Sequence, residues 1–287
     1  MVNYLPTPDS CWKTKPPLNI LGTTFLVLSL LLSPCSTLAD AKIVDVTTLT
    51  DYEPFTFGPT GAVLRERINP GQDSKDLKGF DWDIVRESFH AMGATITLNV
   101  VPWKRGVKLL ENGHTDILFA TTKTEQRIAK GYYFSKNAIH SIKNTLYVRA
   151  NDPIKWNGDV NTLNRVLKGK KVGVRRGFSF GTWWDGNKSK LGATINEVDS
   201  DKSNFKKLQK KRLDFVLAYD IPSDYMLSKT GTKSAYRKIG DVGESTEYLA
   251  THKAKESVSA VNIFDEGFAV IKATGKLAEI KKKWGLD

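Results

Sequence analysis

The sequence predicts an α/β protein made of two Rossmann-like lobes joined by a two-segment hinge. The first observation is that strand-type and helix-type hydrophobic periodicities alternate between residues 41 and 127 and again between residues 160 and 239. The second is that each of these two blocks is succeeded by an extended stretch, at 139–148 and at 248–251. Alternating strands and helices are typical of parallel sheets with right-handed crossovers. Two such blocks therefore indicate two lobes.

The first block begins with a β-rich stretch that alternates apolar and polar residues. Its elements are expected at 41–48 (strand), 79–92 (helix), 94–101 (strand), 103–112 (helix) and 116–120 (strand). The stretch 57–78 is rich in Gly, Pro and charge, which predicts a long loop or a weak hairpin.

The second block repeats this alternation without a fixed repeat length. Its elements are expected at 160–167 (helix), 171–175 (strand), 194–199 (strand), 203–212 (helix), 214–218 (strand), 222–227 (helix) and 234–239 (strand), with a loop running into a further helix after Gly177. Two helices at 255–273 and 275–284 close the chain and are expected to return to the first lobe. The predicted division is lobe I at 40–147, lobe II at 148–247, and a return crossover with C-terminal helices at 248–287.

The first 39 residues are predicted to be a signal peptide. Lys13 and Lys15 precede an apolar run at 18–32, and small residues lead up to Ala39. Cleavage there would send the protein to the periplasm. Two alternatives are a lipoprotein acylated on Cys35, which the preceding proline disfavours, and an uncleaved N-terminal anchor.

Several classes of site are not expected. Cys11 and Cys35 both lie in the predicted leader, so the mature chain would carry no disulfide and no thiol nucleophile. The four histidines, at positions 90, 114, 140 and 252, are too widely spaced to predict a metal site. The sequence contains no dinucleotide or P-loop pattern, so no cofactor is expected.

The formal net charge of +12 is concentrated in lysine and arginine runs at 206–212 and 281–283. Both runs lie on predicted amphipathic helices, where solvated faces are the ordinary interpretation. Aromatic residues are not interleaved with the cations, so nucleic-acid binding is not expected. We expect a monomer.

The stretch 115–135 carries the clearest candidate for a binding site. A buried strand at 116–120 leads to Thr122, and Thr124 is a predicted N-cap of the following helix. Arg127 falls in the first turn of that helix. Free backbone N–H groups, hydroxyls and a guanidinium at the end of a strand suit a carboxylate or phosphate. The alternative is a solvated arginine on an ordinary strand–turn–helix. Tyr52 and Trp103 come after the first two strands, so they belong to the same rim, where ligands of such sheets bind.

A second motif, Gly177-Phe178-Ser179-Phe180-Gly181, matches the nucleophile elbow of serine hydrolases. Asp214 or Asp220 and then His252 come later in the chain, in the order of a catalytic triad. The alternative is that Gly177 and Ser179 form a second anion-binding turn that faces Arg127 from the other lobe.

The chain resembles the periplasmic solute-binding proteins of the amino-acid-type ABC transporter family, which have the type II periplasmic binding protein fold. The segments that carry the resemblance, over nearly the whole mature chain, are Tyr52-x-Pro54-Phe55, Gly79-Phe80-Asp81-x-Asp83, Trp103 thirteen residues before Asp116, Thr122-x-Thr124-x-x-Arg127 followed by Phe134-Ser135, Val172-Gly173-Val174 followed by Gly177, and Tyr248-Leu249-Ala250-Thr251.

The resemblance implies that the protein closes on a small carboxylate-bearing solute and delivers it to an inner-membrane ABC permease. Arg127 would pair with the ligand carboxylate, Tyr52 and Trp103 would sandwich the ligand, and the turn at 177–179 would cap it. The implied ligand-binding residues are Tyr52, Trp103, Ala120, Thr122, Arg127, Arg176, Gly177, Phe178, Ser179, Tyr219 and Asp220. A periplasmic enzyme on the same fold, such as a small-acid dehydratase, and a ligand sensor without a permease are the other functions considered.

The sequence departs from the family pattern at the position where the family usually has an acid that holds the ligand ammonium. That position is Tyr219, and the nearest acid, Asp220, comes one residue later. Phe178 is also bulkier than the residue usual there. An α-amino acid and another small carboxylate or polar solute both remain open.

Overall fold

The computed structural model describes residues 42–59, 64–255 and 258–286. The predicted signal peptide and the alternative acylation site at Cys35 lie outside the described residues. The strands are β1 (Ile43–Thr48), β2 (Asp51–Tyr52), β3 (Thr56–Phe57), β4 (Leu64–Ile68), β5 (Thr95–Val100), β6 (Ile117–Thr122), β7 (Tyr132–Phe134), β8 (His140–Arg149), β9 (Lys171–Arg175), β10 (Thr194–Val198), β11 (Phe215–Tyr219) and β12 (Tyr236–His252). The α-helices are α1 (Phe80–Ala91), α2 (Trp103–Glu111), α3 (Glu125–Ala129), α4 (Leu163–Leu167), α5 (Gly181–Asn187), α6 (Asp201–Gln209), α7 (Asp220–Lys229), α8 (Val258–Ala273) and α9 (Lys276–Trp284).

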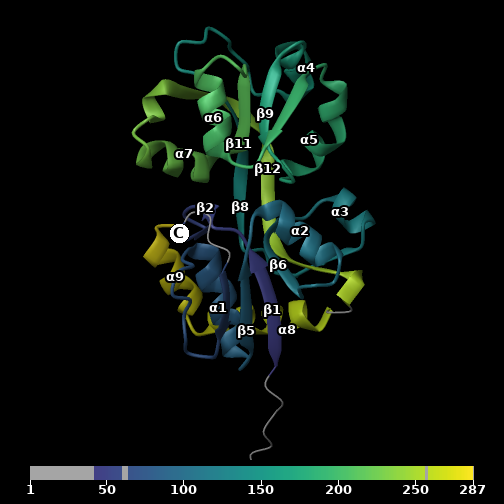
Figure 1. The fold of residues 1–287 in the computed structure, drawn as a ribbon, viewed down its shortest axis with the longest axis vertical. Coiled ribbons are helices and arrows are strands. Elements are labelled where there is room, and N and C mark those ends of the chain that lie inside the picture. The colour runs from purple at the N-terminus through teal and green to yellow at the C-terminus, as the bar shows by residue number, and fades with distance from the viewer. Residues whose placement is uncertain (1–41, 60–63, 256–257, 287) are drawn as a thin grey trace, which may run out of the picture. The chain divides into compact units, whose positions relative to one another are not determined.

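The predicted α/β fold of two lobes is confirmed. Ten of the described strands form one sheet, in which β10-β9-β11-β8-β12-β6-β1-β5-β4 are successive neighbours and β7 pairs with β12. Strand β1 is parallel to β5 and β6, and β9 is parallel to β10 and β11. We call the half with β1, β4, β5 and β6 lobe I and the half with β9, β10 and β11 lobe II. The long antiparallel strands β8 and β12 run between the two halves (Figure 1).

Two predicted segments differ from the structure. The stretch expected as a loop or weak hairpin contains β4, which pairs antiparallel with β5 at the edge of the sheet. The segments expected at 234–239 and 248–251 are two ends of one strand, β12. The pairing of β12 with β8 shifts register between Lys238 and Gly240 and between Asp241 and Gly243. These irregularities explain why the middle of the strand looks like a turn in the sequence.

The core of lobe I fixes the strand ends that carry the candidate site. Strand β6 is buried along its whole length, as expected for a strand covered on both faces. Helix α1 packs on α8, where Phe89 and Phe264 contact each other with ring centroids 6.1 Å apart. The residue that precedes helix α1 is Gly79, whose φ of 138° and whose close approach to the Phe55 carbonyl both require glycine. This places the first turn of α1 directly beside the segment after β2.

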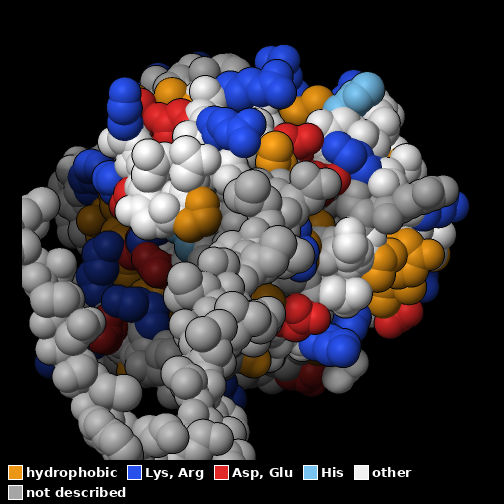
Figure 2. Space-filling model, turned by 90° about the horizontal axis from the view of Figure 1, so that it is seen from below, with side chains coloured by type: hydrophobic (Ala, Val, Ile, Leu, Met, Phe, Trp, Pro, Cys, Tyr) orange, Lys and Arg blue, Asp and Glu red, His pale blue; other side chains and the backbone are white. Residues whose placement is uncertain are grey.

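The charged side chains are dispersed on the face shown in Figure 2. Lysine and arginine side chains lie among acidic and hydrophobic ones there, apart from the area that grey atoms cover. Within the described ranges, no helix combines the length and the hydrophobicity that crossing a membrane requires.

Candidate functional site

The end of β6 and the start of α3 form the cationic side of a pocket. Thr124 caps α3 as predicted, because its hydroxyl accepts a hydrogen bond from the Arg127 N–H at 3.3 Å. The Arg127 guanidinium folds back over the strand end and donates to the Thr122 carbonyl at 2.7 Å. Ala120 on the same strand has φ 59°, a left-handed conformation that costs energy for a residue with a Cβ. Such strain is typical of backbone that is held in place at a binding site.

Aromatic side chains from both lobes line the pocket. Tyr52 and Trp103 belong to lobe I, whereas Phe178 and Tyr219 belong to lobe II. The Phe178 ring lies 5.6 Å from the Trp103 ring and 6.2 Å from the Tyr52 ring, in edge-on contacts. Tyr219 lies 5.8 Å from Tyr52. Phe178 therefore occupies the space between the rings that are expected to sandwich a ligand.

The lobes are joined across the pocket by hydrogen bonds. Trp103 Nε1 donates to the Gly177 carbonyl at 2.9 Å. The Tyr219 hydroxyl lies 3.0 Å from the Thr122 hydroxyl in the other lobe and donates to the Ser179 carbonyl at 2.6 Å. The free space in the pocket is about 10 Å³, enough for about one water molecule. A small solute can therefore enter only when the lobes separate.

Eight of the predicted ligand-binding residues line this pocket. They are Tyr52, Trp103, Ala120, Thr122, Arg127, Phe178, Ser179 and Tyr219. Gly177 contributes its carbonyl to the lobe contact described above. Arg176 is not part of the lining, because its guanidinium pairs with Asp199 at 3.2 Å and with the Glu197 carbonyl at 3.1 Å. Asp220 does not line the pocket either; it begins α7, and its Oδ1 is buried with no hydrogen-bond partner in the described part of the chain.

The pocket also contains an acid that the sequence analysis did not identify. Glu247 on β12 lines the pocket and is only 2% exposed. In the sheet it lies directly opposite Thr122 of β6 on one side and His140 of β8 on the other. Directly opposed residues of antiparallel strands project from the same face, so these three side chains form a row. Glu247 immediately precedes the extended segment predicted at 248–251, so the sequence offered only an acid at the edge of that segment as a signal.

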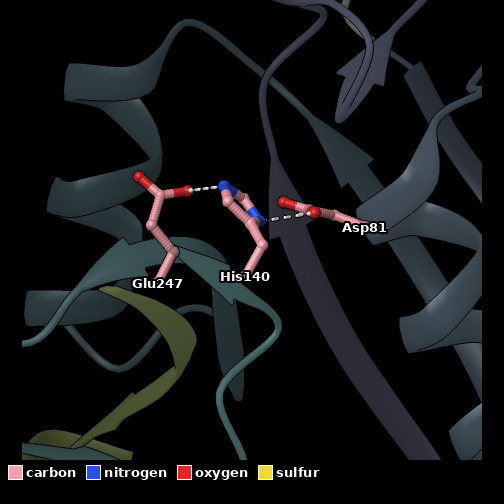
Figure 3. Close-up of side chains that lie close together, drawn as sticks. All are labelled: Asp81, His140 and Glu247. Atoms are coloured by element: carbon pink, nitrogen blue, oxygen red, sulfur yellow. Dashed lines mark hydrogen bonds and ion pairs between the residues drawn. The ribbon is translucent and has the colours of Figure 1, made fainter. Parts of the chain in front are cut away.

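Glu247 is part of a buried charge network that continues away from the pocket. His140 stands between two carboxylates (Figure 3): its Nδ1 lies 2.9 Å from Asp81 Oδ1, and its Nε2 lies 3.4 Å from Glu247 Oε2. The imidazole stacks on Phe55 with ring centroids 3.9 Å apart. The carboxylate and imidazole atoms of the trio lie within 4.8 Å of one another, close enough for metal coordination to be considered. Each ring nitrogen lies within ion-pair distance of a different carboxylate, so these three side chains pair with one another.

Burial and neighbouring charges shift the pKa values of this network. Burial raises the pKa of Glu247 to about 7, and Asp81 adds to this, while His140, Tyr52 and Arg127 oppose it. Burial alone would lower the pKa of His140, but the Asp81 and Glu247 carboxylates together raise it above its ordinary value. The network therefore favours a protonated imidazole between two acids.

The structure does not assemble the catalytic triad that the Gly177–Gly181 motif suggested. The Ser179 hydroxyl contacts Asp185 and accepts from the Gly181 N–H at the start of α5. His252 has both ring nitrogens engaged elsewhere: Nε2 donates to the Lys130 carbonyl at 3.0 Å and Nδ1 accepts from the Ala254 N–H at 3.2 Å. Within the described part of the chain, Ser179 therefore lacks the histidine base that a triad requires.

Comparison with known proteins agrees with this geometry. Residues 68–287 match the family model of the bacterial extracellular solute-binding proteins, family 3. The L-cystine-binding protein TcyJ of Escherichia coli strain K12 is 25% identical over 235 residues, which cover 81% of this chain and 79% of TcyJ.

Solved structures share the fold. A histidine kinase sensor domain with similarity to periplasmic binding proteins superposes with a TM-score of 0.68 at 17% identity, covering 85% of this chain and 96% of that domain. The substrate-binding protein of an amino acid ABC transporter superposes with a TM-score of 0.65 at 20% identity, covering 84% of this chain and 98% of that protein.

Proposed function

The chain belongs to the bacterial extracellular solute-binding proteins, family 3, and from that premise we propose that it captures a small carboxylate-bearing solute, an amino acid or a related polar acid, between its lobes. It would be located in the periplasm, to which the predicted signal peptide at 1–39 would direct it. It would act as a monomer and hand the solute to an inner-membrane ABC permease. The similarity to TcyJ and to an amino acid transporter's binding protein supports this class of ligand.

The observation that carries the proposal is the position of Arg127. Its guanidinium lies 6.0 Å from the centre of the Trp103 ring and lines a pocket to which both lobes contribute. A guanidinium at a site of this kind pairs strongly with a carboxylate through two parallel hydrogen bonds. A ligand that contacts Arg127 in lobe I and the 177–179 turn in lobe II would favour the closed arrangement, because only that arrangement offers both sets of contacts.

A binding role fits the polar groups of the pocket better than catalysis does. The Ser179 hydroxyl is occupied at the start of α5, and His252 is engaged away from it. The pocket offers a fixed cation, hydroxyl groups and aromatic surfaces, which orient a solute but supply no activated nucleophile.

The proposal is tested by ligand screening and then by calorimetry. Thermal-shift measurements on the purified protein with the L-amino acids, L-cystine and small dicarboxylates should give at least one compound that raises the melting temperature. Arg127→Ala should then weaken binding of that compound by about 100-fold, because truncating one partner of a buried charge pair costs about 2–5 kcal/mol.

Arg165→Ala is the matched control, because Arg165 is exposed on α4 and is not among the residues that line the pocket. It should leave the affinity unchanged. Equal affinity of the Arg127→Ala variant and the wild type would show that the carboxylate site has been assigned to the wrong residue.

A further inference from the structure

Phe178 differs in its exposure from the other aromatic residues of the pocket. Four aromatic side chains line the pocket, and three of them, Tyr52, Trp103 and Tyr219, are between 2% and 5% exposed. Phe178 follows β9 on the turn at 177–179 and is partly exposed. Its ring therefore has a side that reaches solvent, whereas the other three rings are enclosed by the protein.

The Phe178 ring makes two sets of contacts that respond differently when the lobes separate. Within lobe II it packs on the Tyr219 ring with centroids 5.5 Å apart, and the Arg175 guanidinium lies 4.5 Å from its centre. In lobe I it contacts the Tyr52 and Trp103 rings, as described above. Separation of the lobes keeps the first set and breaks the second. The contacts with lobe I therefore stabilise the closed arrangement only.

The ring also takes up the space that a solute needs. It lies at the rings of Tyr52 and Trp103, and the Arg127 guanidinium borders the same pocket. In the closed protein about 10 Å³ is left free, which is room for about one water molecule. A solute that contacts both Arg127 and the 177–179 turn has to displace the Phe178 ring. The solvent-exposed side of the ring is the direction in which it can leave.

We propose that Phe178 is a built-in plug of the solute site, which holds the solute-free protein closed and discriminates against solutes whose side chain needs the space of its ring. This inference rests on the proposed function and names a residue that determines its specificity. A closed protein that holds its own ring in the pocket is not competent to bind, so the apparent affinity falls with the competent fraction. The competition is strongest for a solute that carries a ring itself.

The first test measures closure without a solute. Phe178→Ala removes the ring contacts with lobe I and should shift the protein toward the open arrangement. Single-molecule energy transfer between dyes on Lys75→Cys in lobe I and Lys190→Cys in lobe II, with Cys11 and Cys35 replaced by serine, should report the shift. We expect the ratio of closed to open molecules to fall by about tenfold, since two aromatic contacts are lost.

The second test measures specificity with L-phenylalanine and L-alanine as probes. L-phenylalanine carries the phenyl ring that Phe178→Ala lacks, and L-alanine is the same amino acid without that ring. Isothermal titration should show the preference for L-phenylalanine over L-alanine rising by about tenfold in Phe178→Ala relative to the wild type, because an apolar space takes up a ring that fits it. A merely structural role of Phe178 would not change this preference.

Phe134→Ala is the matched control. Phe134 is a partly exposed phenylalanine outside the pocket lining, and its ring packs on Tyr132 and Tyr248 beside β6 of lobe I. Its truncation should leave both the closed population and the preference at the wild-type values. Phe178→Leu keeps an apolar side chain without the ring and should give smaller shifts of the same sign, so it replaces Phe178→Ala if that variant fails to fold.

The other outcomes separate this inference from the proposed function. If Phe178→Ala closes as the wild type does, or keeps the wild-type preference, the plug is wrong while the solute-binding function stands. If Phe178→Ala binds L-phenylalanine and the wild type binds none of the screened compounds, the plug stands and solute capture by the wild type fails. If neither protein binds any probe or screened compound, both proposals fail together.

Discussion

At the scale of single residues, the buried position of Glu247 couples the stability of the protein to pH. The ordinary pKa of a glutamate is 4.5, and burial in the folded protein raises that of Glu247 to about 7. Between these values the folded protein holds a proton that the unfolded chain has released, so this group makes the free energy of unfolding fall as the pH rises. The raised pKa of His140 acts in the same direction, because its stabilising charge is lost as the pH rises through the folded value.

We therefore predict that this network contributes more to the free energy of unfolding of the wild type at pH 5 than at pH 8. Urea unfolding at several pH values should show Glu247→Gln with a flatter dependence than the wild type between about pH 4.5 and 7, by up to about 1.4 kcal/mol per pH unit. The charged groups that act on Glu247 are His140, Asp81 and Arg127, and Tyr52 acts on it through a side-chain hydrogen bond. Parallel curves for the two proteins would mean that Glu247 titrates at an ordinary pKa.

At the scale of secondary-structure elements, helix α8 packs on α1 through a glycine. A Cβ added at Gly267 would lie 1.9 Å from the Ser88 carbonyl oxygen of α1, far inside van der Waals contact. Gly267→Ala should therefore force the two helices apart and lower the free energy of unfolding by about 1–3 kcal/mol or more, measured by urea unfolding.

Gly186 in α5 is the matched control, because a Cβ there would meet no atom within 4 Å. Gly186→Ala should raise the stability by about 0.5–1 kcal/mol, since alanine has the higher helix propensity. If both alanine variants were stabilised, the close packing of α1 and α8 would be disproved.

The elements that could be predicted from sequence are those whose periodicity is local. Helix α1 and strand β6 lie within a few residues of their expected positions, because each carries its own apolar pattern and boundary signal. Strand β12 could not be read as one strand, because its middle, near Gly240 and Gly243, bulges against β8. A strand that is held by pairing partners far away in sequence needs no local pattern of its own.

The same reasoning applies to the candidate site. Arg127 and Thr124 lie in a strand-to-helix signal that is visible within a dozen residues. Glu247 acquires its position only from the register of β12 against both β6 and β8. His140 and Asp81 come together from β8 and α1, a sequence separation of 59 residues. Contacts of this kind are set by tertiary structure, so they cannot be predicted from any single segment of the sequence.

At the scale of the whole molecule, two ion pairs link the lobes outside the pocket. Arg175 of β9 is 4% exposed and donates to Asp51 beside Tyr52 at 2.5 Å, and Lys229 of α7 lies 2.8 Å from Glu53. Arg175 also lies 3.8 Å from Asp201, its partner within lobe II. When the lobes separate, Arg175 keeps Asp201 and loses Asp51, so the contact with Asp51 favours the closed arrangement only.

We predict that Asp51→Ala shifts the protein toward the open arrangement in the absence of solute. A lost charge-assisted hydrogen bond of about 1.5–3 kcal/mol corresponds to a change of roughly tenfold or more in the ratio of closed to open molecules. Single-molecule energy transfer between dyes on Lys75→Cys in lobe I and Lys190→Cys in lobe II, with Cys11 and Cys35 replaced by serine, would report this ratio. A binding amino acid should restore the closed population, because its contacts to both lobes compensate for the missing pair.

Asp199→Ala is the control for this experiment, because Asp199 forms its ion pair with Arg176 inside lobe II at 3.2 Å. Removing a pair within one lobe changes the open and closed arrangements equally, and an interaction that is equal in both states shifts no population. Asp199→Ala should therefore give the wild-type distribution. An identical shift in both variants would trace the effect of Asp51 to surface charge in general. An unchanged distribution in Asp51→Ala would leave the Lys229–Glu53 ion pair and the pocket hydrogen bonds of Tyr219 and Trp103 as the contacts that close the lobes.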